Sequence, residues 1–207
     1  MKTKSFFTSL LLTLIFNLTL YSQEFDSNGL MADIEYLSSD QLEGRFAGTE
    51  GEKAAAKYIA DRFKRLDLKK LSKEYLQNFS FKLPNNPHEE ILYDSYNKDQ
   101  INAINVVGYL DNNKENTVII GAHYDHIGYG GTYSLDTDRM EKNKIHNGAD
   151  DNASGVALLL NLAERLIKED SSNNNYLFIA FSAEELGLIG SKYFAENPLI
   201  SLENANY

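Results

Sequence analysis

Four side chains of the kinds that bind metal ions follow or precede apolar stretches of the chain. His123 follows one apolar run of strand length, and Glu184 and Glu185 follow another. Asp150 lies in a glycine-rich turn just before an apolar segment with helical spacing. Imidazole nitrogen and carboxylate oxygen without sulfur suit a catalytic zinc ion, with cobalt or manganese as alternatives. The sequence therefore predicts a catalytic metal site.

Asp125 stands two residues after His123. In an extended chain this spacing puts both side chains on the same side. Asp125 can then accept the second N–H of the imidazole and fix its tautomer, so we expect it to support catalysis rather than to bind metal. Tyr124 between them either lines the substrate cleft or packs in the core.

The elements around these residues predict an α/β fold. Residues 117–122 and 176–181 are continuously apolar, which indicates strands buried on both faces. Residues 154–168 between them carry apolar side chains at helical spacing. Strand, helix, strand indicates a three-layer αβα fold around a mostly parallel mixed sheet. Sites in open sheets of this kind form beyond the carboxyl ends of the strands, where the candidate ligands lie.

Other elements follow from periodicity and from turn residues. Thr49 and Glu52 have the spacing of a capping box, in which each side chain bonds the backbone of the other residue. Polar loops are expected over 84–100 and 127–147, and the second is either a lid of the site or plain surface. The remaining expected elements are helices over 30–37 and 50–66, strands over 75–81 and 104–110, and a last helix that Ser191 caps and Asn197-Pro198 ends.

Residues 1–22 have the pattern of a secretory signal peptide. Lys2 and Lys4 precede an apolar run, and small residues follow it. An uncleaved N-terminal anchor is the alternative. Residues 23–207 are then a single catalytic domain, exported to the periplasm or the medium. The chain has no cysteine, so neither a disulfide nor an N-terminal lipid is expected.

The chain is acidic, with a formal net charge of −10. Removal of residues 1–22 takes away two lysines, and 18 basic against 30 acidic residues then give −12. Such a charge repels nucleic acid and anionic membranes, so neither is an expected partner once the signal peptide is cleaved. A peptide substrate remains the expected partner, and the sequence leaves the oligomeric state open.

Three motifs in this order resemble the co-catalytic dinuclear zinc aminopeptidase family, which includes bacterial leucyl-type aminopeptidases and glutamate carboxypeptidase. They are GAHYDH from Gly121, GADDNASG from Gly148 and SAEELGLIGS from Ser182. The stretch from Leu37 to Arg45 is also similar to that family. The resemblance extends over nearly the whole mature chain, and it implies a zinc-exopeptidase-like fold.

The resemblance also implies a role for each residue. His123 would bind one zinc ion, Glu185 would bind the other, and Asp150 would bridge the two. Glu184 would be the general base that takes a proton from the attacking water and passes it to the leaving amine. The family often has a cis peptide bond after the bridging aspartate, which implies one between Asp150 and Asp151.

The family completes its site with two further ligands, an aspartate on a later strand and a histidine near the C-terminus. This sequence ends at Tyr207, before either position. We therefore expect a domain that is incomplete at its C-terminus, where late strands and helices are missing. His126 and His146 lie close to the motifs but outside the missing places, so we interpret both as loop histidines rather than replacement ligands.

The sequence thus supports one main hypothesis and two alternatives. The main one is an exported zinc-dependent exopeptidase of the aminopeptidase type, which hydrolyses N-terminal peptide bonds. A carboxypeptidase of the same family is the near alternative. An alternative from another class is a non-catalytic remnant that binds peptide or metal, because one ligand of each of the family's two metal ions lies beyond this sequence.

Overall fold

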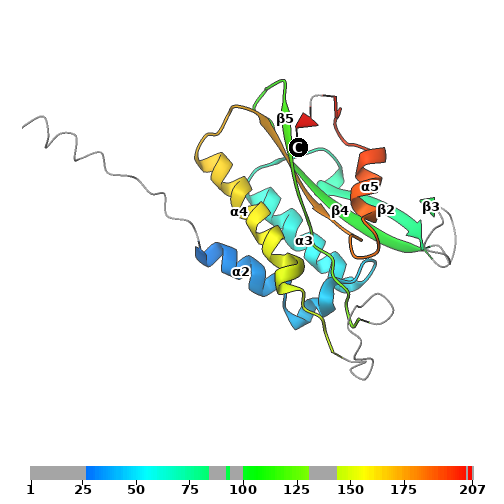
Figure 1. The fold of residues 1–207 in the computed structure, drawn as a ribbon. Coiled ribbons are helices and arrows are strands. Elements are labelled where there is room, and N and C mark those ends of the chain that lie inside the picture. The colour runs from blue at the N-terminus through cyan, green and yellow to red at the C-terminus, as the bar shows by residue number, and fades with distance from the viewer. Residues whose placement is uncertain (1–26, 84–91, 94–99, 131–143, 204, 207) are drawn as a thin grey trace, which may run out of the picture.

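The computed structural model describes residues 27–83, 92–93, 100–130, 144–203 and 205–206 (Figure 1). The expected signal peptide, most of the expected loop at 84–100 and the middle of the loop at 127–147 lie outside the described residues. Within them, no helix has the length and apolar character needed to span a membrane.

The core of the fold is a mixed sheet in the order β3-β2-β4-β6-β5-β7, with β1 also paired to β4. Its strands are β1 Lys69–Lys70, β2 Leu76–Lys82, β3 Leu92–Tyr93, β4 Ile101–Leu110, β5 Thr117–His123, β6 Asn175–Phe181 and β7 Ala205–Asn206. Among these strands only β5 makes parallel pairs, with β6 and β7, and the other four pairings are antiparallel. The prediction of a mostly parallel sheet is therefore wrong for the described residues. Parallel neighbours need a crossover, and the helix between β5 and β6 supplies one.

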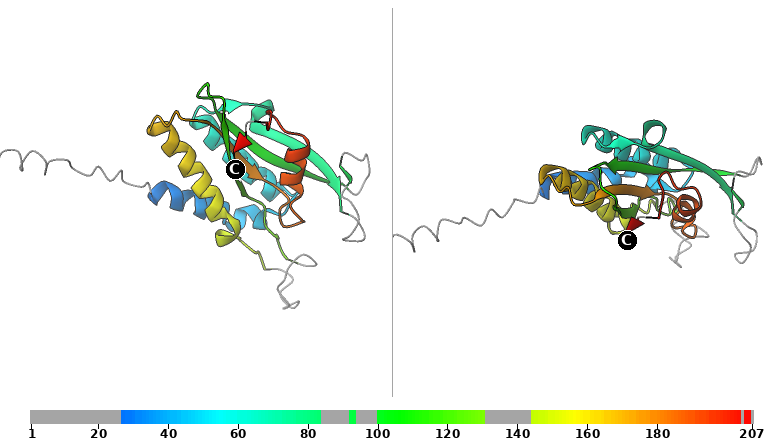
Figure 2. Two further views of the ribbon diagram at one scale, coloured as in Figure 1. Left: turned by 45° about the horizontal axis from the view of Figure 1, so that its top comes forward. Right: turned by 90° about the horizontal axis from the view of Figure 1, so that it is seen from above.

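Helices cover both faces of the sheet, as the sequence predicts (Figures 1 and 2). The helical segments are α2 Ser27–Leu37, η1 Asp40–Arg45, α3 Glu50–Arg65, η2 Lys73–Tyr75, η3 Ala149–Ala153, α4 Ser154–Lys168 and α5 Ile189–Glu196. Alternate residues of β4 point to opposite faces, so Val106 packs in the cluster of α2, α3 and α4 while Val107 packs beside Phe194 of α5.

Helix α3 begins almost as predicted, but its capping differs. Thr49 Oγ1 accepts the Glu52 N–H at 3.3 Å. Glu52 does not return the bond to Thr49. Its carboxylate accepts the Gly48 N–H at 2.7 Å and, from the sheet, the Ile104 N–H at 3.1 Å. The buried Glu52 thereby joins the start of the helix to the sheet, next to the strand ends that carry the candidate site.

Two further expectations need correction. Helix α5 begins at Ile189, and Ser191 lies inside its first turn, where Ser191 Oγ donates to the Leu188 carbonyl at 3.0 Å. Strand β5 was expected to be buried on both faces, yet only Thr117 of it is buried. The reason is that β7 pairs only with Thr117 and Val118, so the rest of this side of β5 has no strand beside it among the described residues.

Candidate metal centre

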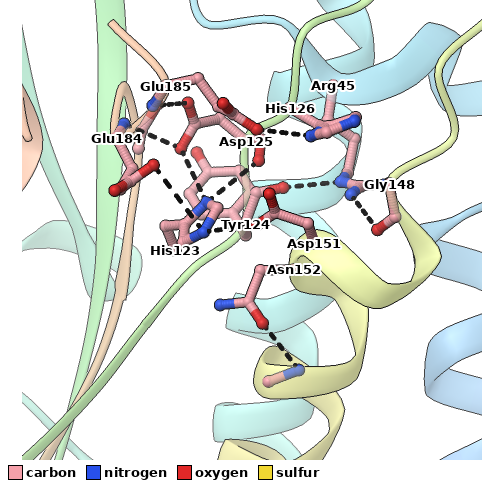
Figure 3. Close-up of polar contacts among 12 residues, drawn as sticks. Arg45, His123, Tyr124, Asp125, His126, Gly148, Asp151, Asn152, Glu184 and Glu185 are labelled. Carbon is pink, nitrogen blue, oxygen red and sulfur yellow. Dashed lines mark hydrogen bonds and ion pairs between the residues drawn. The ribbon is translucent and has the colours of Figure 1, made fainter. Parts of the chain in front are cut away.

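The carboxyl ends of the parallel strands β5 and β6 bring the candidate ligands together (Figure 3). His123 is the last residue of β5, and its Nε2 lies 3.1 Å from Asp151 Oδ1 and 3.8 Å from Glu184 Oε2. Three segments that are distant in sequence therefore meet at one imidazole, at the edge of the sheet where sites of α/β proteins form.

Asp125 is buried and holds the turn after β6. Its two carboxylate oxygens accept the backbone N–H groups of Glu184, at 3.1 Å, and of Glu185, at 3.3 Å. The shortest contact of His123 Nδ1 is with the Asp125 carbonyl oxygen, at 3.3 Å, whereas the Asp125 carboxylate is 3.8 Å away. Burial raises the pKa of Asp125 to about 8, and the two backbone N–H groups act in the opposite direction.

Glu184 and Glu185 lie in a turn and not in a helix. The N–H groups of Gly187 and Leu188 both donate to the Glu184 carbonyl, at 2.8 and 2.9 Å. The two adjacent carboxylates approach different histidines. Glu184 lies toward His123, while Glu185 Oε1 lies 2.5 Å from His126 Nδ1.

The glycine-rich turn places Asp151, and not Asp150, at the site. Asp151 has extended backbone angles within η3, and its carboxylate reaches His123. Asp150 is exposed, and its carbonyl accepts the Ser154 hydroxyl at 2.8 Å. The backbone of this turn is irregular, so the position of each aspartate relative to the start of α4 does not predict which carboxylate points toward β5. The cis peptide bond is also one residue later than expected, between Asp151 and Asn152.

His126 was interpreted as a loop histidine, but it lies inside the site. His126, Asp151 and Glu185 each offer one ligand atom, and these atoms all lie within 4.8 Å of one another. Its position three residues after His123, where the chain leaves β5, was the signal in the sequence. The other loop histidine of this interpretation, His146, is not in the group.

Arg45 is a buried cation that ties the segments of the site together, and its position in the sequence gave no sign of this. Burial lowers the pKa of Arg45 to about 10, while Asp125, Asp151 and Glu185 raise it, so the guanidinium is charged at neutral pH. It donates to the carbonyl oxygens of Tyr124 at 2.6 Å, Asn147 at 2.7 Å and Gly148 at 2.9 Å, and to that of Leu37.

A second buried network holds the segment before Glu184. Ser182 Oγ donates to Glu52 Oε1 at 2.5 Å, and the Ser182 N–H donates to the Asn105 side-chain oxygen at 3.1 Å. Tyr124 is fully buried, and its hydroxyl donates to the Ile104 carbonyl at 2.6 Å. Tyr124 is therefore a core residue, which decides between the two roles that its sequence position left open.

The residues present fit a metal ion. Nitrogen and oxygen ligands of one tetrahedral zinc ion lie about 3.4 Å apart, so groups within 4.8 Å can close on a cation by small side-chain rotations. The turn also leaves room for the histidine ring. Gly148 has a φ of +58°, and a Cβ there would lie 2.6 Å from His126 Cγ. Only glycine allows both the turn and the ring at this place.

Comparison with known proteins agrees with this geometry. Residues 105–207 match the model of peptidase family M28. Aminopeptidase YwaD of Bacillus subtilis is 35% identical over 80 residues, which make up 39% of this chain and 14% of that protein. The structure is similar to a Zn-dependent exopeptidase from Parabacteroides distasonis, with a TM-score of 0.68, 23% identity, and coverage of 89% of this chain and 60% of that chain. A glutaminyl cyclase from Bacteroides thetaiotaomicron matches with a TM-score of 0.67, 20% identity and the same coverage.

At these identities the solved structures show the fold, an α/β fold with a mixed sheet that matches zinc exopeptidases over part of their length. The chain spans about 60% of those two structures and a smaller part of YwaD. The matched family region contains His123, Asp151, Glu184 and Glu185. The chain therefore belongs to peptidase family M28, and it covers part of that family's fold.

Proposed function

We propose that this chain is part of an exported zinc-dependent exopeptidase of the aminopeptidase type, which hydrolyses the N-terminal peptide bond of peptides. One observation carries the proposal. The ends of β5 and β6 and the turn before α4 bring His123, Asp151 and Glu184 together, with 3.1 and 3.8 Å from His123 Nε2 to the two carboxylates.

His123, Asp151 and Glu185 would hold zinc in this function. Asp151 lies between His123 and the pair formed by His126 and Glu185. Its carboxylate contacts His123, and it also belongs to the group of possible ligands with His126 and Glu185. This position supports the bridging role that the family resemblance implies for an aspartate of this turn. When bound, zinc supplies a Lewis acid that polarises the scissile carbonyl and makes water more acidic.

The position of Glu184 supports a role in proton transfer. Its side chain is about one-third exposed at 34%, and its backbone N–H is held by the buried Asp125. A carboxylate that is not committed to the metal can accept a proton from the attacking water at an Oε atom and deliver it to the leaving amine nitrogen. Asp125 fixes the turn on which this base lies, so it contributes to positioning.

Export and substrate class rest on the sequence. Residues 1–22 have the signal-peptide pattern, and the acidic chain favours neither nucleic acid nor an anionic membrane as partner. A peptide amino terminus is positively charged and suits an acidic site. A carboxypeptidase substrate would bring a carboxylate toward Asp151, Glu184 and Glu185, which disfavours that alternative electrostatically.

The test is hydrolysis of aminoacyl-4-nitroanilides by the purified chain after zinc is added. The Glu184→Gln variant keeps the size of the side chain and removes the base, so we expect kcat to fall by about 10²–10⁴-fold while bound zinc is unchanged. Glu196→Gln, on the exposed side of α5, is the matched control and should behave as the wild type. Equal activity of Glu184→Gln and the wild type would exclude the proposed base.

Substrates blocked at one end distinguish the alternatives. Cleavage of peptides with a free amino terminus and a blocked carboxyl terminus supports an aminopeptidase, and the reverse preference supports a carboxypeptidase. A peptide with N-terminal glutamine that cyclises without hydrolysis would instead place the chain with the glutaminyl cyclases that share its fold. Bound zinc without turnover of any of these peptides would support the non-catalytic alternative.

A further inference from the structure

We infer that His126 is a metal ligand, and that with Asp151 and Glu185 it forms a three-ligand site within this chain. The inference rests on the proposed zinc-dependent function, because it assigns a ligand of the same site. The motif resemblance assigns no metal to His126, and the sequence alone favours a loop residue.

The ligand atoms of the three residues lie close together. His126 Nδ1 lies 2.5 Å from Glu185 Oε1, and Asp151 completes a group whose ligand atoms lie within 4.8 Å of one another. The short contact joins an imidazole nitrogen and a carboxylate oxygen, and both atom types are zinc ligands. A cation that enters here finds the two atoms already side by side.

The imidazole ring of His126 is held in place. His126 is 14% exposed and Glu185 is 19% exposed, unlike the side chains of a solvated loop. The backbone N–H of His126 donates to the Arg45 carbonyl at 3.3 Å, and the ring lies against Gly148, where a Cβ would be 2.7 Å from His126 Cδ2. A fixed ring loses little side-chain entropy when it binds a metal ion.

The charges around the group also favour a bound cation. Asp125, Asp151 and Glu185 are close enough to the Arg45 guanidinium to raise its pKa, but the hydrogen bonds described for this guanidinium all go to backbone carbonyls. Arg45 therefore does not occupy the carboxylates of Asp151 and Glu185, which instead contact the imidazoles of His123 and His126. A divalent ion beside a neutral imidazole would offset both charges.

The competing explanation is that His126 only positions Glu185 through a hydrogen bond. The two roles can be separated, because an asparagine amide N–H can donate from nearly the same place as Nδ1, whereas an amide nitrogen does not bind zinc. His126→Asn therefore keeps the positioning contact and removes the ligand. His146→Asn is the matched control, since it changes a second histidine of the same long loop that is outside the group.

The experiment is calorimetric titration of the whole chain with zinc alone, after circular dichroism has shown that each variant is folded. We expect His126→Asn to bind zinc at least ~100-fold more weakly than the wild type, a loss at or beyond the upper end for residues that only support a ligand. His146→Asn should bind as the wild type does. Wild-type affinity in His126→Asn would overturn the inference.

A measurement on the wild type removes the dependence on variants. NMR-active cadmium bound to the chain with nitrogen-labelled histidine should show a direct cadmium–nitrogen coupling to His126, and its absence at a saturated site would refute the inference. Both experiments omit substrate, so they are independent of turnover. If His126→Asn binds zinc weakly and the wild type hydrolyses no peptide, the proposed function fails and the inference stands. If the wild type hydrolyses peptides and His126→Asn binds zinc as the wild type does, the inference fails and the proposed function stands.

Discussion

At the level of single residues, the candidate site depends on a buried arginine as much as on its acids and histidines. A guanidinium has five N–H donors in a rigid planar fork and stays charged when buried. Arg45 directs these donors to four carbonyls, which belong to the end of α2, the segment after β5 and the turn before α4. One side chain thus holds the segments of His126 and Asp151 at a fixed separation (Figure 3).

We predict that Arg45→Met lowers the free energy of unfolding by at least ~3 kcal/mol, because each carbonyl left buried without a donor costs about 1–3 kcal/mol. Urea unfolding with linear extrapolation measures the change. Arg165→Met is the control, because Arg165 on α4 is exposed and its side chain pairs only with Glu169 among the described contacts. The loss of this surface pair should cost under ~0.5 kcal/mol. Equal losses in the two variants would contradict the clamp role of Arg45.

The residue scale also shows where sequence reasoning stops. His123, Glu184 and Glu185 lie together because strand ends in a sheet meet at one edge, which periodicity predicts. The motif resemblance implies Asp150 as the bridging ligand, and the residue types alone do not distinguish two adjacent aspartates in a turn. Their directions depend on the irregular backbone of η3, which only the structure shows.

At the level of elements, close approach of α3 to η1 fixes the N-terminal half of the fold. Gly51 lies in the first turn of α3, and a Cβ there would collide with the Leu42 carbonyl. We predict that Gly51→Ala destabilises the protein by roughly 1–3 kcal/mol through overpacking, although alanine favours a helix by about 1 kcal/mol over glycine. Chemical denaturation measures this, with Lys57→Ala on the exposed side of α3 as control. A more stable Gly51→Ala protein would show that α3 can move away from η1.

The contact between α2 and α3 gives a prediction for pH. Burial raises the pKa of Asp33 above 3.8, despite the Tyr58 hydroxyl at 2.6 Å and the Arg62 guanidinium at 3.2 Å. The folded state then binds this proton more tightly than the unfolded state. The stabilising contribution of Asp33 is present below pH 3.8 and is lost as the pH rises through the raised pKa.

Unfolding measured from pH 3.5 upward should therefore show the stability of the wild type falling relative to Asp33→Asn. Asp61→Asn is the control of opposite sign, because Lys57 lowers the pKa of Asp61 at the surface of α3. Its contribution is present above pH 3.8 and is lost as the pH falls through the lowered pKa. Parallel pH profiles for the two variants would show that burial does not govern Asp33.

Elements were easier to predict than their pairing. The helix 154–168 and the strands on either side follow from periodicity and length, and the structure confirms them to within a residue. Strand direction depends on contacts between distant segments. Strands β2 and β4 pair in antiparallel fashion, and β6 inserts between β4 and β5 although a short turn joins those two. The sequence pattern alone contains neither fact.

At the level of the whole molecule, a metal ion at the candidate site would add a link between three parts of the chain. His123 ends β5 and His126 follows it, Asp151 precedes α4, and Glu185 follows β6. A ligand that binds only the folded arrangement stabilises the fold by an amount that grows with the logarithm of its concentration, and this reaches about 2.7 kcal/mol at 100 times its dissociation constant. For a chain of this size that corresponds to a rise in melting temperature of roughly 5–10 °C.

We therefore predict that zinc raises the melting temperature of the wild type and that a chelator reverses the rise. Glu185→Gln removes a ligand oxygen at the centre of the group and should abolish most of the shift, while Glu196→Gln on α5 should keep it. Differential scanning calorimetry at fixed zinc concentration measures both. If zinc raises the melting temperature of Glu185→Gln as much as that of the wild type, zinc binds elsewhere on this acidic chain. Surface carboxylates can also hold cations without joining these three segments.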